Sequence, residues 1–220
     1  MGARMLIPQI RSIVARGCNV SQFSIEALDR GYGDTLGCAF RRTLLSSICG
    51  TAVTEVEIVG SSNEFSSVTG IAEDSLQLAL NIRNVVFKLD VHIASLTLTL
   101  RKTNPGTVYA RDIQTDYRCQ IVNPNHIICH LDSGRLSAYL KIQKGWGYVP
   151  KSNGLCWNNG KLIMDAFYSP VKNVSYSVSL INYNSERLIL NIETNGSVTP
   201  IEALRQSIHI LKSQFSLLSV

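Results

Sequence analysis

The sequence is poor in charge and has no long apolar run. Charged residues make up 17% of its 220 residues, whereas hydrophobic residues make up 45%. This balance excludes the class of disordered chains, which combine high charge with few apolar residues. No stretch approaches the ~18 consecutive apolar residues of a membrane span, so we expect no contact with a membrane. The length is sufficient for one large domain or two small ones.

Closely spaced cysteines are also missing. The six cysteines are spread along the chain without a single C-x-x-C pair. Because a structural zinc site needs closely spaced ligand pairs, we expect no metal, and nothing else in the sequence indicates a cofactor. A chain with this much apolar content does not depend on disulfides, which predicts reduced thiols in an intracellular compartment.

Recognisable catalytic motifs are absent as well. The sequence has no G-x-S-x-G elbow, no P-loop and no G-x-G-x-x-G after a strand. Cys129 and His130 are neighbours on a predicted strand, so their side chains point to opposite faces and cannot form a dyad. Glu55 and Glu57 share one face of another strand. They are candidates for acid–base chemistry, but the solvated face of a strand is the better interpretation. We therefore expect no catalytic residue.

The charge that is present leaves two partner classes open. The formal net charge is +5, which is compatible with a nucleic acid or with an acidic protein. The basic residues are scattered singly rather than in runs, so the charge alone is weak evidence for either class.

Residues 28–50, LDRGYGDTLGCAFRRTLLSSICG, predict the central helix of the chain. A short side-chain oxygen of Asp34 or Thr35 is placed to cap its first turn. The helix is expected to run to about Ile48, and Gly50 is expected to end it.

This helix carries more apolar surface than one buried face requires. Cys38 and Leu45 widen its main apolar stripe, Arg41 falls within the widened arc, and Arg42 lies at its edge. Embedded arginines favour a contact with a partner, although a core helix with two snorkelling arginines fits the periodicity equally well. The main stripe consists of Leu36, Phe40, Leu44 and Ile48.

A second helix is predicted at the end of the chain. Thr199 and Glu202 form a capping box, and Pro200 occupies the first helical position. Two apolar rows on one helix indicate burial against its own domain and against a partner, for which a homodimer seam is the simplest form; a wholly intramolecular helix is the alternative. The first row spaces its members by three and four residues: Ile201, Leu204, Ile208, Leu211, Phe215 and Leu218. The second is Ala203, Ile210 and Leu217.

The middle of the chain is rich in strand signals. One short helix is predicted over residues 70–84, and turn residues separate the apolar strand segments on either side of it. The fold class is therefore α+β. Residues 144–150, KGWGYVP, place Trp146 and Tyr148 between glycines. A base-stacking platform is one interpretation; a packed loop is the one we favour, because few lysines lie nearby.

Several of these segments resemble one family in order and spacing. They are LDRGYGDTLGCAFRRTLLSSICGTAVTEVEI at 28–58, HIICHL at 126–131, KGWGYVP at 144–150, YSPV at 168–171 and ETNG at 193–196. The chain resembles the alpha subunit of bacterial-type DNA-directed RNA polymerase, whose forms include the plastid one, over its N-terminal assembly domain.

The resemblance implies a non-catalytic scaffold of a nucleotidyltransferase complex. It implies an α/β dimerisation subdomain built from both chain ends, 1–49 and 172–220, and an inserted, mainly β subdomain over 50–171 that contacts the large subunits. The implied partners are a second copy and the beta and beta-prime subunits, with DNA reached only through the complex. The implied location is the bacterial cytoplasm or a plastid.

The resemblance also assigns residues to these contacts. It places the dimer interface on the two helices, at Leu36, Phe40, Leu44, Ile48, Leu204, Ile208, Leu211, Phe215 and Leu218. It places large-subunit binding at Arg41, Arg42, Leu45, Arg83 and Met164.

The sequence also departs from the pattern of this family. It ends at Val220, so the family's C-terminal DNA-binding domain is expected to be absent. Two other interpretations stay open. One is a nucleic-acid-binding module that uses the basic surface with Trp146 and Tyr148; the other is a small hydrolase, for which no motif speaks.

Overall fold

The computed structural model describes residues 9–15, 17–61, 63, 65–150, 156–158 and 161–217, with the backbone alone for 11–13 and 156–158. The chain forms two compact units. Unit 1 combines Met1–Ile48 with Ser169–Val220, and unit 2 is Cys49–Tyr168. Over the described residues, the fold combines three α-helices with antiparallel sheets, which confirms the predicted α+β class.

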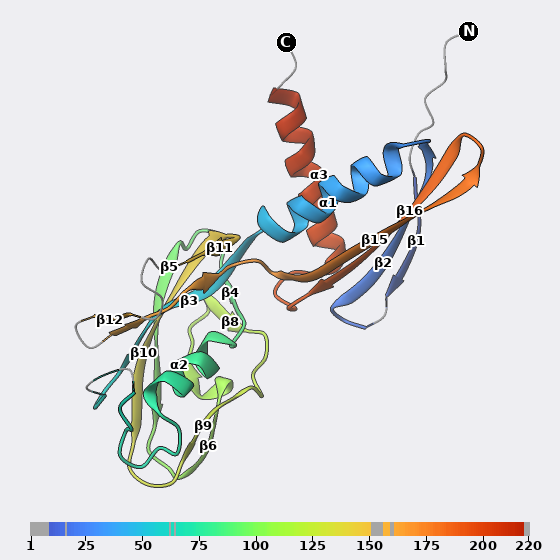
Figure 1. Cartoon of the computed structure of the whole chain (residues 1–220). Helices are drawn as coiled ribbons and strands as arrows, with labels where there is room; N and C mark the ends of the chain where they lie inside the picture. The colour runs from blue at the N-terminus through green and yellow to red at the C-terminus, as the bar shows by residue number, and fades with distance from the viewer. Residues whose placement is uncertain are drawn as a thin grey trace. The chain divides into compact units, whose positions relative to one another are not determined.

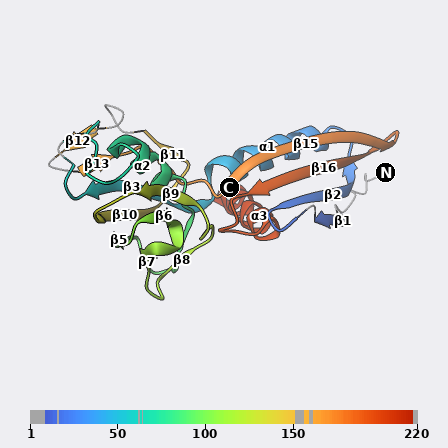
Figure 2. The same ribbon diagram turned by 90° about the horizontal axis from the view of Figure 1, so that it is seen from below.

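Unit 1 is a four-stranded antiparallel sheet with helices on one face (Figures 1 and 2). The strands lie in the order β1-β2-β16-β15, so the two ends of the chain share one sheet. The strands are β1 (Gln9–Ala15), β2 (Val20–Asp29), β15 (Val171–Asn182) and β16 (Ser185–Thr194). The helices are α1 (Tyr32–Ser46) and α3 (Pro200–Leu217).

The core of unit 1 follows from the alternation of apolar residues along the strands. Every second residue of β16 is buried, and the same period runs through β2. The inward side chains meet apolar residues of α1 and α3. The cluster contains Phe23, Ile25 and Leu28 from β2, Leu188, Leu190 and Ile192 from β16, and Phe40, Leu44, Ala203 and Leu204 from the helices.

A bulge near the end of β2 holds Ala27 in the left-handed region of backbone space. Its φ is 61°, and the ladder with β16 shifts register between the pairs Ile25–Leu188 and Leu28–Glu186. A residue with a β-carbon is strained in this conformation, whereas glycine is not.

Ala27→Gly is therefore expected to stabilise unit 1 by about 0.5–1 kcal/mol, because it removes this strain. Urea unfolding followed by far-UV circular dichroism measures the change. The contrasting control is Ala39→Gly within α1, where an ordinary helical conformation should make glycine destabilising by about 1 kcal/mol. Equal destabilisation by both substitutions would contradict the strain at Ala27.

Unit 2 is built on a six-stranded antiparallel sheet in the order β12-β13-β3-β10-β5-β7. These strands are β12 (Cys156–Asn158), β13 (Lys161–Ile163), β3 (Cys49–Ile58), β10 (Leu136–Trp146), β5 (Ser95–Lys102) and β7 (Ile113–Gln114). Three further pairs complete the unit. They are β4 (Phe87–Leu89) with β8 (Cys119–Ile121), β6 (Gly106–Tyr109) with β9 (Ile127–Leu131), and β11 (Tyr148–Val149) with β14 (Ala166–Phe167).

Helix α2 (Ser75–Arg83) packs against β9 and β3 in unit 2. It begins later than the predicted 70–84, because Asp74 is its N-cap and accepts a hydrogen bond from the Gln77 N–H at 2.6 Å. Glu73 was predicted to lie in the first turn but precedes the helix. Its carboxylate binds His130 instead, through the backbone N–H and the ring, each at 2.8 Å.

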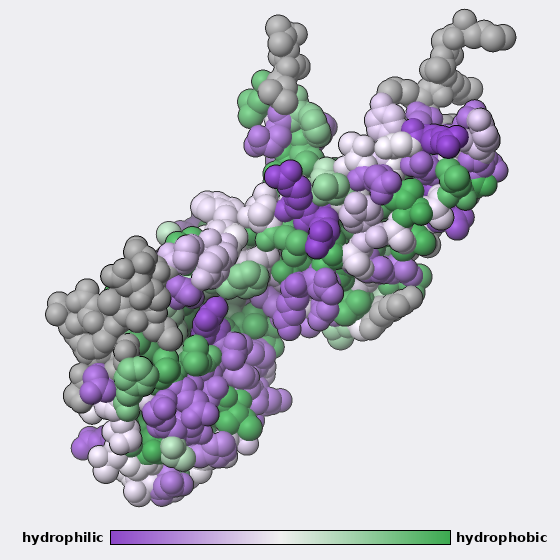
Figure 3. Space-filling view, viewed as in Figure 1, coloured by the Kyte–Doolittle hydropathy of each residue, from purple (hydrophilic) through white to green (hydrophobic). Residues whose placement is uncertain are grey.

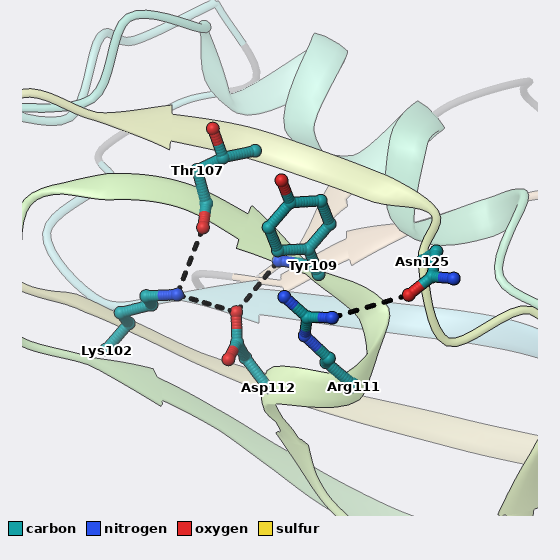
Figure 4. Close-up of polar contacts among 6 residues, drawn as sticks. All are labelled: Lys102, Thr107, Tyr109, Arg111, Asp112 and Asn125. Carbon is teal, nitrogen blue, oxygen red and sulfur yellow. Dashed lines mark hydrogen bonds and ion pairs between the residues drawn. The ribbon is translucent and has the colours of Figure 1, made fainter.

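A polar cluster joins β5 to the 3-10 turn after β6 (Figure 4). The Lys102 ammonium donates to the Asp112 carboxylate at 2.8 Å and to the Thr107 carbonyl at 3.0 Å. The Tyr109 N–H donates to the same carboxylate at 2.8 Å. Burial works against the charged form of Asp112, but these hydrogen bonds and the charges of Lys102 and Arg111 outweigh it and lower the pKa of Asp112 below 3.8.

Asp112 is therefore expected to make unit 2 sensitive to acid. Because its pKa is lower in the folded than in the unfolded chain, its stabilising contribution is complete above about pH 4 and is lost as the pH falls through the lowered value. Both tryptophans, Trp146 and Trp157, belong to unit 2, so tryptophan fluorescence follows its unfolding. Asp112→Asn should flatten the loss of stability below pH 4. Asp132→Asn, at an exposed carboxylate of the same unit, is the control.

Candidate assembly interface

The N-terminus of α1 is capped from the other end of the chain. The Glu186 carboxylate on β16 accepts from the Gly31 N–H at 3.0 Å and from the Gly33 N–H at 2.9 Å. The prediction that Asp34 or Thr35 caps this helix was wrong. Gly31 occupies the N-cap position, and Thr35 Oγ1 donates to the Gly31 carbonyl rather than accepting from a free N–H.

Two glycines bring α1 into close contact with β15. A β-carbon at Gly37 would lie 2.5 Å from the Tyr176 ring, and one at Gly33 would lie 2.6 Å from Val178. No other residue fits at these positions without a shift of the strand. The cap and these contacts together hold α1 against the sheet and determine which of its side chains remain outside.

The apolar stripe of α1 lies inside unit 1. Phe40, Leu44 and Ile48 are 8%, 0% and 1% exposed and belong to the unit's own core, while Leu36 and Leu45 are partly buried against it. Helix α1 also ends at Ser46, before the predicted Ile48, and Gly50 already belongs to β3. The stripe therefore anchors α1 within its own chain.

The two arginines of α1 point away from this core. Arg41 and Arg42 are both exposed, so Arg41 does not lie within a buried apolar arc. Adjacent exposed guanidinium groups on a firmly held helix are suited to carboxylates of a partner.

Helix α3 has one buried and one exposed side. Ala203, Leu204 and Ser207 are 0%, 3% and 0% exposed and pack into unit 1, and Leu211 is partly buried against the same core. On the other side, Ile201, Ile208 and Phe215 are 46%, 41% and 67% exposed. We call these three residues the α3 outer row. The predicted interface residue Leu218 lies outside the described residues.

The outer row lies on a helix that extends beyond its own support. In Figure 1 the second half of α3 projects past α1 and away from the sheet of unit 1. Figure 3 shows apolar surface on this projecting part, where Phe215 and Leu217 are 67% and 79% exposed. An apolar row on a free helical segment is the feature of a helix that packs against a second chain.

The structure separates the two predicted contact residues of unit 2. Arg83, the last residue of α2, is exposed. Met164 is only 2% exposed and belongs to the core of unit 2, so its side chain is not available to a partner.

The packed-loop interpretation of residues 144–150 was wrong. Trp146 ends β10 and is 65% exposed, and Tyr148 begins β11 and is 52% exposed. Sequence reasoning identified these two aromatic residues, but it missed Phe167 on β14, which pairs with Tyr148 and is also 52% exposed.

The candidate acid–base residues are engaged in ion pairs. Glu55 binds Lys141 at 2.7 Å and Glu57 lies 3.7 Å from Lys161, on the solvated face of the sheet. The hollow between these pairs has a volume of only about 70 Å³, well below that of typical small-molecule sites. The predicted solvated face is therefore the observed one.

The Cys129–His130 pair and the other candidate ligands give no reactive constellation. Cys129 is fully buried, and burial raises the pKa of its thiol to about 12, whereas the His130 side chain is exposed. Five cysteines of the described residues are free thiols. Within that part of the chain, no three histidine, cysteine or acidic side chains gather where they could hold a metal ion. None of its helices is both long and apolar enough to cross a membrane.

Comparison with known families identifies the chain. The model of the RNA polymerase Rpb3/RpoA insert domain matches residues 56–169, just over half of the sequence and nearly all of unit 2. The chain belongs to the Rpb3/RpoA family of RNA polymerase subunits. It is thus an alpha-type subunit of a DNA-directed RNA polymerase, which is a nucleotidyltransferase complex, and its surfaces are to be understood as sites of assembly within that complex.

Proposed function

We propose that this chain is the homodimerising alpha subunit of a bacterial-type RNA polymerase and forms a scaffold for the beta and beta-prime subunits. It carries no active site of its own in this proposal. The bacterial cytoplasm or a plastid is the compartment we propose, on the family resemblance of the sequence. The single observation that carries the scaffold role is the outer row of α3, which is apolar, exposed and opposite a buried side.

A second copy is the simplest occupant of the α3 outer row. Its members follow one another at intervals of seven residues, the repeat that lets one helix pack along another. Most homo-oligomers are two-fold dimers in which the same surface is used twice. In this proposal, Ile208 and Phe215 contact the second copy directly. Phe40, Leu44, Ile48 and Leu204 support the interface from within unit 1.

The exposed arginines of α1 are the proposed contact with a large subunit. Arg41 and Arg42 are adjacent and exposed, and guanidinium groups bind carboxylates with two parallel hydrogen bonds. Leu45, partly buried beside them, contributes apolar contact in this proposal. Arg83 on unit 2 is proposed as a second contact.

Replacement of both arginines tests this assignment. The double variant Arg41→Ala/Arg42→Ala is expected to bind the beta subunit at least about tenfold more weakly, because interfacial arginines commonly contribute more than 1 kcal/mol each. Co-expression of the tagged chain with beta, followed by quantitative affinity capture, measures this. The dimer should be unaffected. Arg135→Ala, at an exposed arginine of unit 2, is the matched control. Normal capture by the double variant would show that the arginines are not the contact.

A further inference from the structure

Residues 144–150 present aromatic side chains outside unit 2 for a structural reason. A β-carbon at Gly145 would lie 2.7 Å from the Tyr168 ring, so only glycine permits this close approach. Gly147 has a φ of 61°, a left-handed conformation that favours glycine. The two glycines therefore serve to seat the segment on Tyr168 and to turn the chain between Trp146 and Tyr148.

The resulting surface is held in place rather than frayed. Tyr148 and Val149 pair with Phe167 and Ala166, and the Tyr168 N–H donates to the Gly147 carbonyl at 2.8 Å. The Tyr148 hydroxyl donates to the Asp165 carboxylate at 3.0 Å. Because these side chains are already ordered, little conformational entropy is lost when a partner covers them.

Tyr148 and Phe167 are direct cross-strand partners, so their rings lie on the same face of the ribbon. Together with the neighbouring Trp146, we call them the aromatic surface. Since each side chain is at least half exposed and aromatic residues bury 150–250 Å² when fully covered, roughly 300 Å² of aromatic area faces solvent. Exposed apolar patches of this size are often functional in single chains.

The charges around the aromatic surface favour a protein over a nucleic acid. The Lys144 ammonium is bound to the carbonyls of Asp90 and Val91 and is not free for phosphate. The Asp165 carboxylate lies at the hydroxyl of Tyr148, where it repels phosphate. Arg83 is exposed, forms no ion pair within the described residues, and is close enough that its charge acts on Tyr148. A stacking site for nucleic acid needs a cationic groove along the backbone, whereas aromatic residues with one arginine are typical of protein hot spots.

We propose that the aromatic surface is a docking site for a large subunit of the polymerase, which contributes an apolar side chain against Tyr148 and Phe167 and a carboxylate toward Arg83. The occupant follows from the family: the matched region contains the whole surface, and a subunit of this family is assembled into a larger polymerase complex. The inference rests on the proposed scaffold function and adds a second contact, distinct from the arginines of α1.

The test uses the full chain co-expressed with the beta and beta-prime subunits, with capture of each measured at increasing subunit concentration. Phe167→Ser and Trp146→Ser should weaken capture of one large subunit by about 30-fold, the loss expected for a hot-spot aromatic residue. Tyr117→Ser is the matched control, because Tyr117 is 93% exposed in another loop of unit 2. Thermal unfolding of each variant must match that of the unmodified chain.

The outcomes separate this inference from the scaffold function. Capture of both large subunits within twofold of the unmodified chain by Phe167→Ser, together with loss on Arg41→Ala/Arg42→Ala, would overturn the aromatic docking site and leave the scaffold intact. Failure of the unmodified chain to capture either subunit would overturn the scaffold itself. Unchanged capture with weakened binding of a single-stranded oligonucleotide would replace the docking site with a nucleic-acid site.

Discussion

Ile208→Glu is expected to convert the dimer into a monomer. A carboxylate placed in the middle of the α3 outer row would be buried against an apolar surface in both copies, and a two-fold interface doubles the effect. The expected loss is several kcal/mol of association free energy, about a thousandfold or more in the dissociation constant. Sedimentation velocity over the micromolar range measures it. The side chain is 41% exposed within its own chain, so folding should not depend on it.

A second isoleucine provides the control for this substitution. Ile127 on β9 of unit 2 is 45% exposed, nearly the same as Ile208. Ile127→Glu should therefore leave the chain dimeric. If both variants remain dimeric, the outer row is not the interface. If both dissociate, the effect of Ile208→Glu does not report on α3.

Glu186→Ala is expected to destabilise unit 1 by about 2–3 kcal/mol. The substitution leaves the N–H groups of Gly31 and Gly33 without their charged acceptor, and the Gly33 group is buried. It also removes a negative charge from the positive end of the α1 dipole. Because unit 1 contains neither tryptophan, the loss should be seen by far-UV circular dichroism and be absent from tryptophan fluorescence.

Two related variants sharpen this prediction. Glu186→Gln retains one good acceptor and is expected to lose less stability than Glu186→Ala. Glu193→Ala, on the opposite face of the same strand, should have almost no effect. Equal stability of Glu186→Ala and the unmodified chain would show that the cap does not hold α1.

The sequence predicted most of what depends on local chemistry. The capping box of Thr199 and Glu202 located α3, and the Glu202 N–H does donate to Thr199 Oγ1 at 3.3 Å. Alternating apolar residues located the long strands β10 and β16. Both signals act over a few residues, so no tertiary information is needed to interpret them.

The errors occurred where a distant residue decides the outcome. The cap of α1 comes from Glu186, 153 residues from Gly33, and a nearby Asp34 offered a plausible local substitute. Trp146 and Tyr148 are exposed because Tyr168 occupies the space beneath Gly145, a contact that periodicity cannot reveal.

The same limit applies to the predicted interface. Both sides of α3 are apolar, so the pattern predicts two contacts but cannot assign them. The contact of α3 with α1 and the sheet buries Leu204 and leaves Ile208 and Phe215 exposed. Met164 likewise belongs to an apolar strand segment, and only its packing shows that it is buried.

Sedimentation equilibrium of the unmodified, purified chain tests the central claim most directly. The scaffold account predicts a particle of twice the 24.3 kDa chain mass at micromolar concentration, with no other subunit present. A mass of 24.3 kDa throughout that range would contradict it, because the α3 outer row would then have no second copy to cover it.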